Sequence, residues 1–474
     1  MSSVESTRSF DLDCLAVFRN SFYDCLERRS DALFELTEAV LCSDGPVHTL
    51  VGLSLAAEHR RGHGALYDGL GSGRIDFARL RRSVAGLPVP RDGDGRILLA
   101  VDVSPWLRPD AATSPDRAFC HVYGRGKGQA QMIPGWPYSF VAALEPGRTS
   151  WTAMLDAVRI DPDDDLTTVT STQIREVVDR LRLAGQHQPH DPAILIVFDA
   201  GYDITRLAYL LVDLPVELVG RIRSDRVLAL PAAARPAART GRPAKHGPEF
   251  VLADATTYPK PQVSTHTDTD RYGLAEASAW HRLHPMLKHR GNWADHAGPL
   301  PTIEGTLLRL RVQYLPGDRN PKPVWLWCSN PDATATEVDR YWRTFLRRFD
   351  IEHTFRFFKQ TLGWTRPHLR DPHAADRWTW LVIAAHTQLR LARNLTHDLR
   401  RPWEKPASRP DRLTPARVRR GFRNLRPTTA LPARAPKPSR PGPGRPPGSK
   451  NKQPAPHQPV GKNATTPTST AGGG

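Results

Sequence analysis

Three acidic residues, far apart in the sequence, occupy positions suited to metal-dependent chemistry on phosphodiester bonds. Asp102 lies within the apolar run RILLAVDVSPWLRP, Asp199 ends the apolar run AILIVFDA, and Glu352 lies in an amphipathic segment. A carboxylate inside an apolar strand is costly unless it is paired or binds a metal ion, so such positions suggest function. Two aspartates at strand ends and one glutamate on a helix can together hold a pair of divalent cations.

The segments around these acids predict an α/β fold. Short apolar runs bounded by turn residues indicate strands, and apolar residues at helical spacing indicate helices. The expected order of three strands, a helix, a strand, a helix and a strand is that of a mixed sheet flanked by helices. In chain order these elements are expected at 96–104, 118–124, 138–144, 170–185, 194–200, 204–213 and 216–224. The segment 341–364 is expected to form one long helix.

The chain of 474 residues is long enough for two or three domains. Residues 1–92 predict a helical domain, which could be a helix-turn-helix-like DNA reader or an ordinary helical cap on the core. Residues 93–402 predict the catalytic domain, with a β-rich insertion at about 227–331. Residues 403–474 are rich in proline and basic residues and predict a largely disordered tail.

The formal net charge of +17 favours a polyanionic partner such as nucleic acid. From Arg412 onward the chain holds 13 Lys or Arg and no Asp or Glu, so this segment carries most of the excess. A merely solubilising tail is the alternative. Five scattered cysteines without a CxxC pair fit reduced thiols. With no apolar run of membrane-spanning length and no signal segment, we expect no membrane association and a cytoplasmic, nucleoid-associated protein.

The segment 341–364 adds a spacing pattern to the acidic residues. At intervals of three, four and seven residues it carries Phe345, Arg348, Glu352 and Lys359, which would fall along one helical stripe. Together with AVDVSPWLRP, VFDAGYD and RIRSDR, this pattern resembles the DDE transposases of bacterial insertion sequences. The corresponding helix of those enzymes has tyrosine, arginine, glutamate and lysine at the same spacing. Phe345 departs from the tyrosine.

The resemblance covers about residues 95–395 and implies a ribonuclease-H-like core. It implies that Asp102, Asp199 and Glu352 are the catalytic and metal-binding residues. Oxygen ligands favour two Mg²⁺ ions, for which Mn²⁺ can substitute. The implied activity is cleavage of the element's ends and transfer of the freed 3′-OH strand to target DNA. The implied partners are double-stranded DNA, as terminal inverted repeats and target, and a second copy of the chain in a synaptic homodimer.

Several basic residues are expected to contact DNA. Arg348 and Lys359 could contact phosphates on either side of Glu352, although an Arg348–Glu352 ion pair on a surface helix is the alternative. A Gly-Arg-Pro core with flanking lysines at 441–452 resembles an AT-hook for a narrow minor groove. The remaining expected contacts are Arg221, Arg223 and Arg226 after a strand, and Arg445, Lys450 and Lys452 in the tail.

Two other functions stay open at the level of sequence. One is a ribonuclease-H-like nuclease without strand transfer, and the other is a catalytically inactive, transposase-derived DNA-binding protein. The insertion also holds Trp280 and Trp293, which could stack on a flipped base or pack in the core; packing is the favoured interpretation. Asp203 is expected to cap the helix that follows Asp199.

Overall fold

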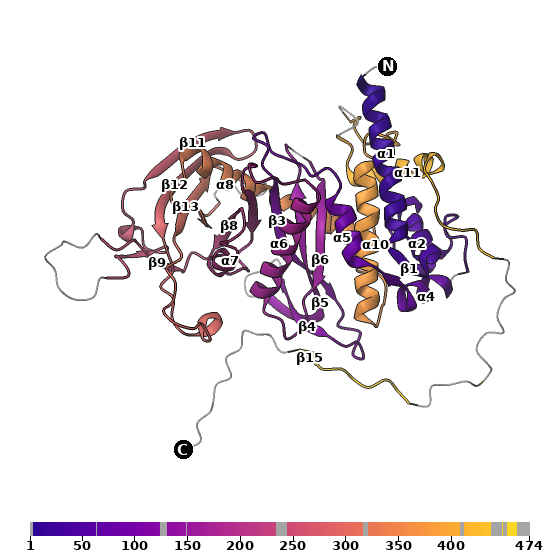
Figure 1. The fold of residues 1–474 in the computed structure, drawn as a ribbon, viewed down its shortest axis with the longest axis horizontal. Helices are drawn as coiled ribbons and strands as arrows, with labels where there is room; N and C mark the ends of the chain where they lie inside the picture. The colour runs from indigo at the N-terminus through magenta and orange to yellow at the C-terminus, as the bar shows by residue number, and fades with distance from the viewer. Residues whose placement is uncertain are drawn as a thin grey trace.

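The computed structural model describes residues 3–62, 64–123, 130–147, 149–233, 244–315, 321–407, 412–437, 448 and 453–461. Its centre is a large mixed β-sheet with helices packed around it (Figure 1). In space the strands follow the order β11-β12-β13-β14-β8-β7-β3-β5-β4-β15, and β6 also pairs with β5. The strands span Leu98–Leu107 (β3), Arg117–Tyr123 (β4), Ala130–Leu144 (β5), Thr152–Arg159 (β6), Ile194–Phe198 (β7), Val216–Ile222 (β8), Val263–Thr269 (β11), Gly273–Leu283 (β12), Gly305–Val312 (β13), Val324–Cys328 (β14) and Val460–Gly461 (β15).

Strands β6, β5, β3, β7 and β8 form the part of the sheet that carries the predicted acids. β3 is parallel to β7, and β7 is parallel to β8, whereas β5 is antiparallel to both β3 and β6. Every residue of β7 is buried, as expected for a parallel strand covered on both faces. This mixed sheet flanked by helices is consistent with the expected ribonuclease-H-like arrangement.

The predicted element order is wrong between β5 and α6, because it lacks strand β6. Asp156 interrupts its apolar run and hides the strand in the sequence. In the structure Asp156 is fully buried, and it accepts hydrogen bonds from Arg81 at 2.8 Å and Arg180 at 2.6 Å. Two guanidinium groups from distant helices therefore neutralise a carboxylate that would otherwise be too costly to bury.

Helices cover both faces of the sheet. On β5, the Ser139 hydroxyl donates a hydrogen bond of 2.7 Å to Gln173 of α6 (Leu166–Leu183). The next residue, Phe140, packs on Phe355 of α9 (Phe349–Gln360), with ring centroids 5.0 Å apart. Because successive side chains of a strand point to opposite faces, α6 and α9 lie on opposite sides of the sheet. The shorter helix α7 (Ile204–Leu210) begins at Asp203, whose side chain accepts from the Arg206 amide, which confirms the predicted cap.

The stretch expected as an insertion contributes further strands to the same sheet. β14 pairs antiparallel with β8, and β13, β12 and β11 follow it outward. A separate two-stranded sheet is formed by β9 (Val227–Ala229) and β10 (Glu249–Val251). Trp280 is 3% exposed, packs with Phe250 and Trp325, and donates its indole N–H to the Pro259 carbonyl. These contacts place Trp280 in the core, as favoured from the sequence, and Trp293 is buried as well.

The first 92 residues are mostly helical, as predicted, and pack around helix α10 (Pro372–Leu391), as Figure 1 shows. Arg19 lies fully buried between Glu38, at 2.7 Å, and Gln388 of α10, at 2.6 Å. Arg60 and Arg61 form ion pairs with acids of the same chain, which favours the interpretation as a helical cap. The helices are α1 (Ser3–Asp24), α2 (Ser30–Cys42), α3 (Leu50–Ser54), α4 (Gly64–Ser72) and α5 (Phe77–Ala85), with a small hairpin of β1 (Leu26–Arg28) and β2 (Arg74–Ile75).

The prediction of a largely disordered tail from residue 403 is wrong for helix α11 (Pro415–Leu425). Val418 and Phe422 of α11 are fully buried, and the helix packs on α2 and α10. Its arginines are bound within the chain: Arg419, for example, donates to the carbonyl oxygens of Val40 and Gly45. Basic residues of this segment therefore hold the helical unit together as well as adding charge.

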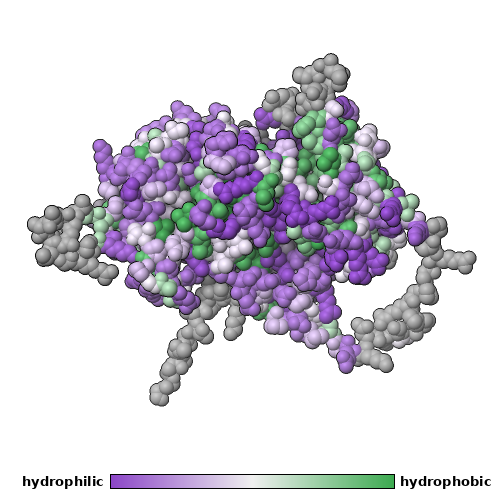
Figure 2. Space-filling model, in the orientation of Figure 1, coloured by the Kyte–Doolittle hydropathy of each residue, from purple (hydrophilic) through white to green (hydrophobic). Residues whose placement is uncertain are grey.

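Hydrophilic residues dominate the face seen in Figure 2, with smaller groups of hydrophobic residues among them. Of the helices within the described ranges, none has the length and hydrophobicity needed to span a bilayer.

His386, at the centre of α10, predicts a specific pH dependence of stability. Its ring is fully buried against Phe358 and Trp151, and within the described residues neither ring nitrogen has a hydrogen-bond partner. Burial lowers the pKa of His386 to about 3. Between this pKa and the ordinary histidine value the unfolded chain binds more protons, so His386 makes the protein less stable as the pH falls from about 6.5 toward 3.

We expect His386→Phe to remove this contribution, which amounts to at most about 1.4 kcal/mol per pH unit. The measurement is the free energy of unfolding of both proteins by denaturant between pH 7 and pH 4. Identical pH dependences for the two proteins would contradict a neutral, buried His386.

Candidate active site

The register of the parallel strands brings Asp102 and Asp199 together. Residues Leu98–Val101 of β3 pair in order with residues Leu195–Phe198 of β7. Asp199 directly follows β7, whereas Asp102 lies halfway along β3, which continues to Leu107 beside β5, so the expected strand end is wrong for Asp102. Both acids lie where the parallel pairing of β3 with β7 ends. The carboxyl ends of parallel strands are the usual place for ligands in open α/β sheets.

Glu352 reaches this edge from α9. The segment expected as one helix forms two, α8 (Ala335–Arg347) and α9, and Arg348 separates them. At this junction the Arg348 amide donates to the Phe345 carbonyl at 3.0 Å. This bond spans three residues instead of the four of an α-helix, so the turn is tighter. Phe355 and Phe358 of α9 pack on Phe140, which is the partner of Asp102 across β3 and β5. The aromatic contact thus fixes Glu352 relative to Asp102.

One guanidinium group connects all three acids. Arg348 Nη1 lies 2.7 Å from Asp102 Oδ2, and its Nη2 lies 3.1 Å from Glu352 Oε1 and 3.6 Å from Asp199 Oδ2. The Arg348 side chain is only 5% exposed, whereas those of Asp199 and Glu352 are 40% and 47% exposed. The structure therefore gathers the three predicted residues at one place and leaves two of the carboxylates accessible.

The electrostatics of this site favour an additional positive charge. Burial raises the pKa of Asp102 to about 6, against the opposing effect of Arg348, and the nearby Asp199 and Glu352 raise it further. Because one guanidinium faces three carboxylates, the site also keeps an excess of negative charge. Lys359 lies on the same helix, 5.6 Å from the centre of the Trp364 ring, and burial lowers its pKa to about 8.

Tyr202 is a neighbour of the site that the sequence did not single out. It lies in the same VFDAGYD segment as Asp199, is 9% exposed, and packs on Phe198 at 5.3 Å between ring centres. Burial raises the pKa of Tyr202, and the charge of Asp102 adds to this effect. The phenol therefore stays protonated beside the acids.

The basic residues expected to contact DNA have different surroundings. Arg348 is bound to the carboxylates and does not lie on the surface, so a phosphate contact by Arg348 would require it to leave them. Arg221 is exposed and follows Gly220, the β8 partner of Phe198, which places it at the same sheet edge as Asp199. Arg223 and Arg226 are exposed too, and Arg223 pairs with Asp225. Arg445, Lys450 and Lys452 lie outside the described residues.

The donor set suits a hard divalent cation. Asp102, Asp199 and Glu352 offer carboxylate oxygens only, the ligands that Mg²⁺ and Mn²⁺ prefer. Within the described ranges, no three Asp, Glu, His or Cys residues already stand in a metal-binding arrangement. At the three carboxylates the Arg348 guanidinium provides the positive charge instead, as a stand-in cation.

Comparison with known families agrees with this geometry. Residues 21–286 match the family of DDE superfamily endonucleases. The match covers more than half of the chain, which therefore belongs to this family, and membership implies metal-dependent nuclease activity. Asp102 and Asp199 lie inside the matched range, whereas Glu352 lies beyond it, so its assignment depends on the geometry and on the spacing within its helix. A search among curated proteins gives no match.

Removing Arg348 should destabilise the protein, because the three carboxylates would then repel one another without a neutralising charge. We expect Arg348→Ala to lower the free energy of unfolding by about 2–3 kcal/mol, less than for a completely buried ion pair because two partners are half exposed. Adding Asp102→Asn to this variant should restore part of the loss. Denaturant unfolding at pH 7 measures both effects.

Arg356→Ala is the matched control, since Arg356 is an exposed arginine of α9, the helix that follows Arg348. It should change stability by less than about 0.5 kcal/mol. Equal stabilities of the Arg348 and Arg356 variants would show that the carboxylates do not depend on the guanidinium.

Proposed function

We propose that the protein is a DNA transposase that cleaves the ends of a mobile element and joins the freed 3′-OH strands to target DNA. The observation that carries this proposal is the convergence of Asp102, Asp199 and Glu352 on Arg348 at the carboxyl edge of the sheet. Membership of the DDE endonucleases supports the phosphodiester chemistry. The helical spacing around Glu352 supports the transposases within that class.

In this proposal Asp102, Asp199 and Glu352 hold two Mg²⁺ ions, or Mn²⁺ in their place. Bound there, such ions lower the pKa of an attacking water and stabilise the leaving 3′ oxygen. Arg348 keeps the three carboxylates gathered, and it could turn toward a DNA phosphate if other cations neutralised them. Lys359, on the same helix and with its pKa lowered to about 8, is placed to add positive charge next to Asp102.

The proposed partners are double-stranded DNA, both as terminal inverted repeats and as target, and a second copy of the chain that completes the synaptic complex. A precleaved DNA end separates the proposal from its nearest alternative. Joining of that end to target DNA is strand transfer, whereas cleavage without joining would indicate a nuclease. Metal-independent binding with neither reaction would indicate an inactive DNA-binding protein.

We expect Asp102→Ala, Asp199→Ala and Glu352→Ala each to reduce nicking and joining by more than about 100-fold, because a metal clamp supplies several kcal/mol of transition-state stabilisation. DNA affinity without metal should stay near the wild-type value. Gel assays of nicking with Mg²⁺, paired with fluorescence anisotropy in EDTA, measure both. Wild-type nicking by any one variant would remove that residue from the proposed site.

The basic tail should contribute salt-dependent DNA affinity. Residues 438–474 contain five Lys or Arg and no acid. A chain ending at Lys437 should reduce the slope of log affinity against log salt by up to about 4, because fewer counterions are released on binding. A chain ending at Gly461 loses only one of these charges and is the control. Equal slopes for the two chains would show that the tail does not contact DNA.

A further inference from the structure

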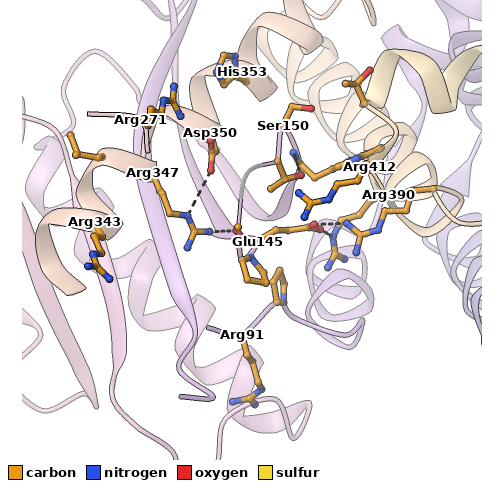
Figure 3. Close-up of a pocket in the computed structure, with 18 of the residues that line it drawn as sticks. Arg91, Glu145, Ser150, Arg271, Arg343, Arg347, Asp350, His353, Arg390 and Arg412 are labelled. Carbon is orange, nitrogen blue, oxygen red and sulfur yellow. Dashed lines mark hydrogen bonds and ion pairs between the residues drawn. The ribbon is translucent and has the colours of Figure 1, made fainter. Parts of the chain in front are cut away.

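A large cavity lies along a face of α8 and α9 that does not carry the three acids. It has a volume of about 1250 Å³ and is lined by the β5–β6 connection, the β11–β12 turn, the end of α10 and the segments 88–91 and 412–414. We call it the arginine groove, because the described residues that line it include seven arginines, among them Arg271, Arg343, Arg347, Arg390 and Arg412. Figure 3 shows these side chains around Glu145.

The acids of the groove do not balance its arginines. Three acidic residues line it, and the most buried of them, Glu145, is already bound by Arg390 at 2.8 Å and by Arg393. Asp350 is 4.0 Å from Arg347. Two acids outside the lining also pair with groove arginines: Asp339 lies 3.7 Å from Arg343, and Asp191 lies 3.5 Å from Arg91. Arg347 Nε is buried and has no hydrogen-bond partner among the residues that the structure describes. The seven arginines thus face five acids, three in the lining and two outside it, so the groove keeps an excess of positive charge.

Two of the arginines are exposed and held in place by aromatic rings. The Arg343 guanidinium lies 5.3 Å from the centre of the Trp342 ring, and its side chain is 54% exposed. The Arg271 guanidinium lies 5.4 Å from the centre of the Tyr272 ring, and the residue is exposed. Stacking on a ring orients the guanidinium, and the exposed N–H groups that do not face Asp339 stay available.

These features fit a chain of phosphates. The groove exceeds the usual volume of about 300–1,000 Å³ for small-molecule sites. Guanidinium groups bind phosphate oxygens through paired hydrogen bonds. We propose that the arginine groove binds the sugar–phosphate backbone of a DNA segment other than the one held at the three carboxylates. This inference rests on the proposed function, because it gives the same enzyme a second DNA contact.

The position of the groove explains how both contacts can belong to one complex. Arg347 lines the groove, and its neighbour Arg348 binds the catalytic acids. Successive helical residues point about 100° apart, so Arg347, Asp350 and His353 share one face while Arg348 and Glu352 share another. The two sites therefore lie on different sides of the same helical segment. A DNA segment in the groove would lie beside the scissile strand without entering its site.

The test uses the full chain with Asp102→Ala, so that binding is measured without cleavage. We expect Arg271→Glu with Arg343→Glu to weaken binding of duplex DNA more than tenfold at about 0.1 M salt, and to lower the salt slope by about 2, one unit for each lost phosphate contact. Fluorescence anisotropy between 50 and 300 mM salt measures both. Arg74→Glu with Arg311→Glu is the control, because it reverses the same charge at two exposed arginines that do not line the groove.

A second measurement does not depend on those variants. Ser150 lines the groove, and Ser264 is an exposed residue of β11 that does not. DNA with a bromoacetyl group on a backbone phosphorothioate should crosslink to Ser150→Cys much faster than to Ser264→Cys.

Equal affinity and salt slope for the two charge-reversal pairs, or equal crosslinking at 150 and 264, would overturn the groove proposal. Cleavage by the wild-type chain reports separately on the proposed function. If the wild-type chain cleaves DNA but the groove variant binds DNA as well as its control, only the groove proposal is wrong. If the groove variant binds DNA less tightly but the wild-type chain shows no metal-dependent cleavage, the catalytic proposal is wrong and the groove proposal stands.

Discussion

Three carboxylates that must stay close together are the constraint to which the rest of this fold responds. Asp102, Asp199 and Glu352 would repel one another, and Asp102 is largely buried, where its charge is poorly solvated. The structure answers with one buried guanidinium that touches all three. Its planar fork suits this task better than an ammonium group would, because two separate nitrogen atoms contact acids on different elements. Even so, one positive charge faces three carboxylates, so an excess of negative charge remains.

The surrounding frame keeps this arrangement in register. The pairing of β3 with β7 places the two aspartates side by side. On the neighbouring strand β5, Phe140 packs against Phe355 of α9. Behind α9, Phe357 and Phe358 contact the buried His386 of α10. Helix α10 in turn is the core around which the N-terminal helices and α11 pack. Segments from the whole chain thus contribute to the position of one glutamate.

The fold and the acids were largely predictable from sequence, because apolar strands that carry an aspartate and an amphipathic helix are local patterns. The role of Arg348 was not. Its pairing with Glu352 is visible at a spacing of four residues, but its contact with Asp102 spans 246 positions and depends on tertiary packing. Strand β6 was missed because Asp156 is buried with partners on two helices. Helix α11 was missed because its many arginines indicate a solvated tail until their acceptors on distant segments are known.

The junction between α8 and α9 links the two charged regions of the molecule. Two consecutive arginines there have different surroundings. Arg348 binds the three acids, whereas Arg347 lines a groove with an excess of positive charge. An uninterrupted helix would already direct the two side chains about 100° apart, and the tight turn at Arg348 adjusts that angle. The same short stretch of backbone therefore positions one arginine for the acids and the next one for the groove.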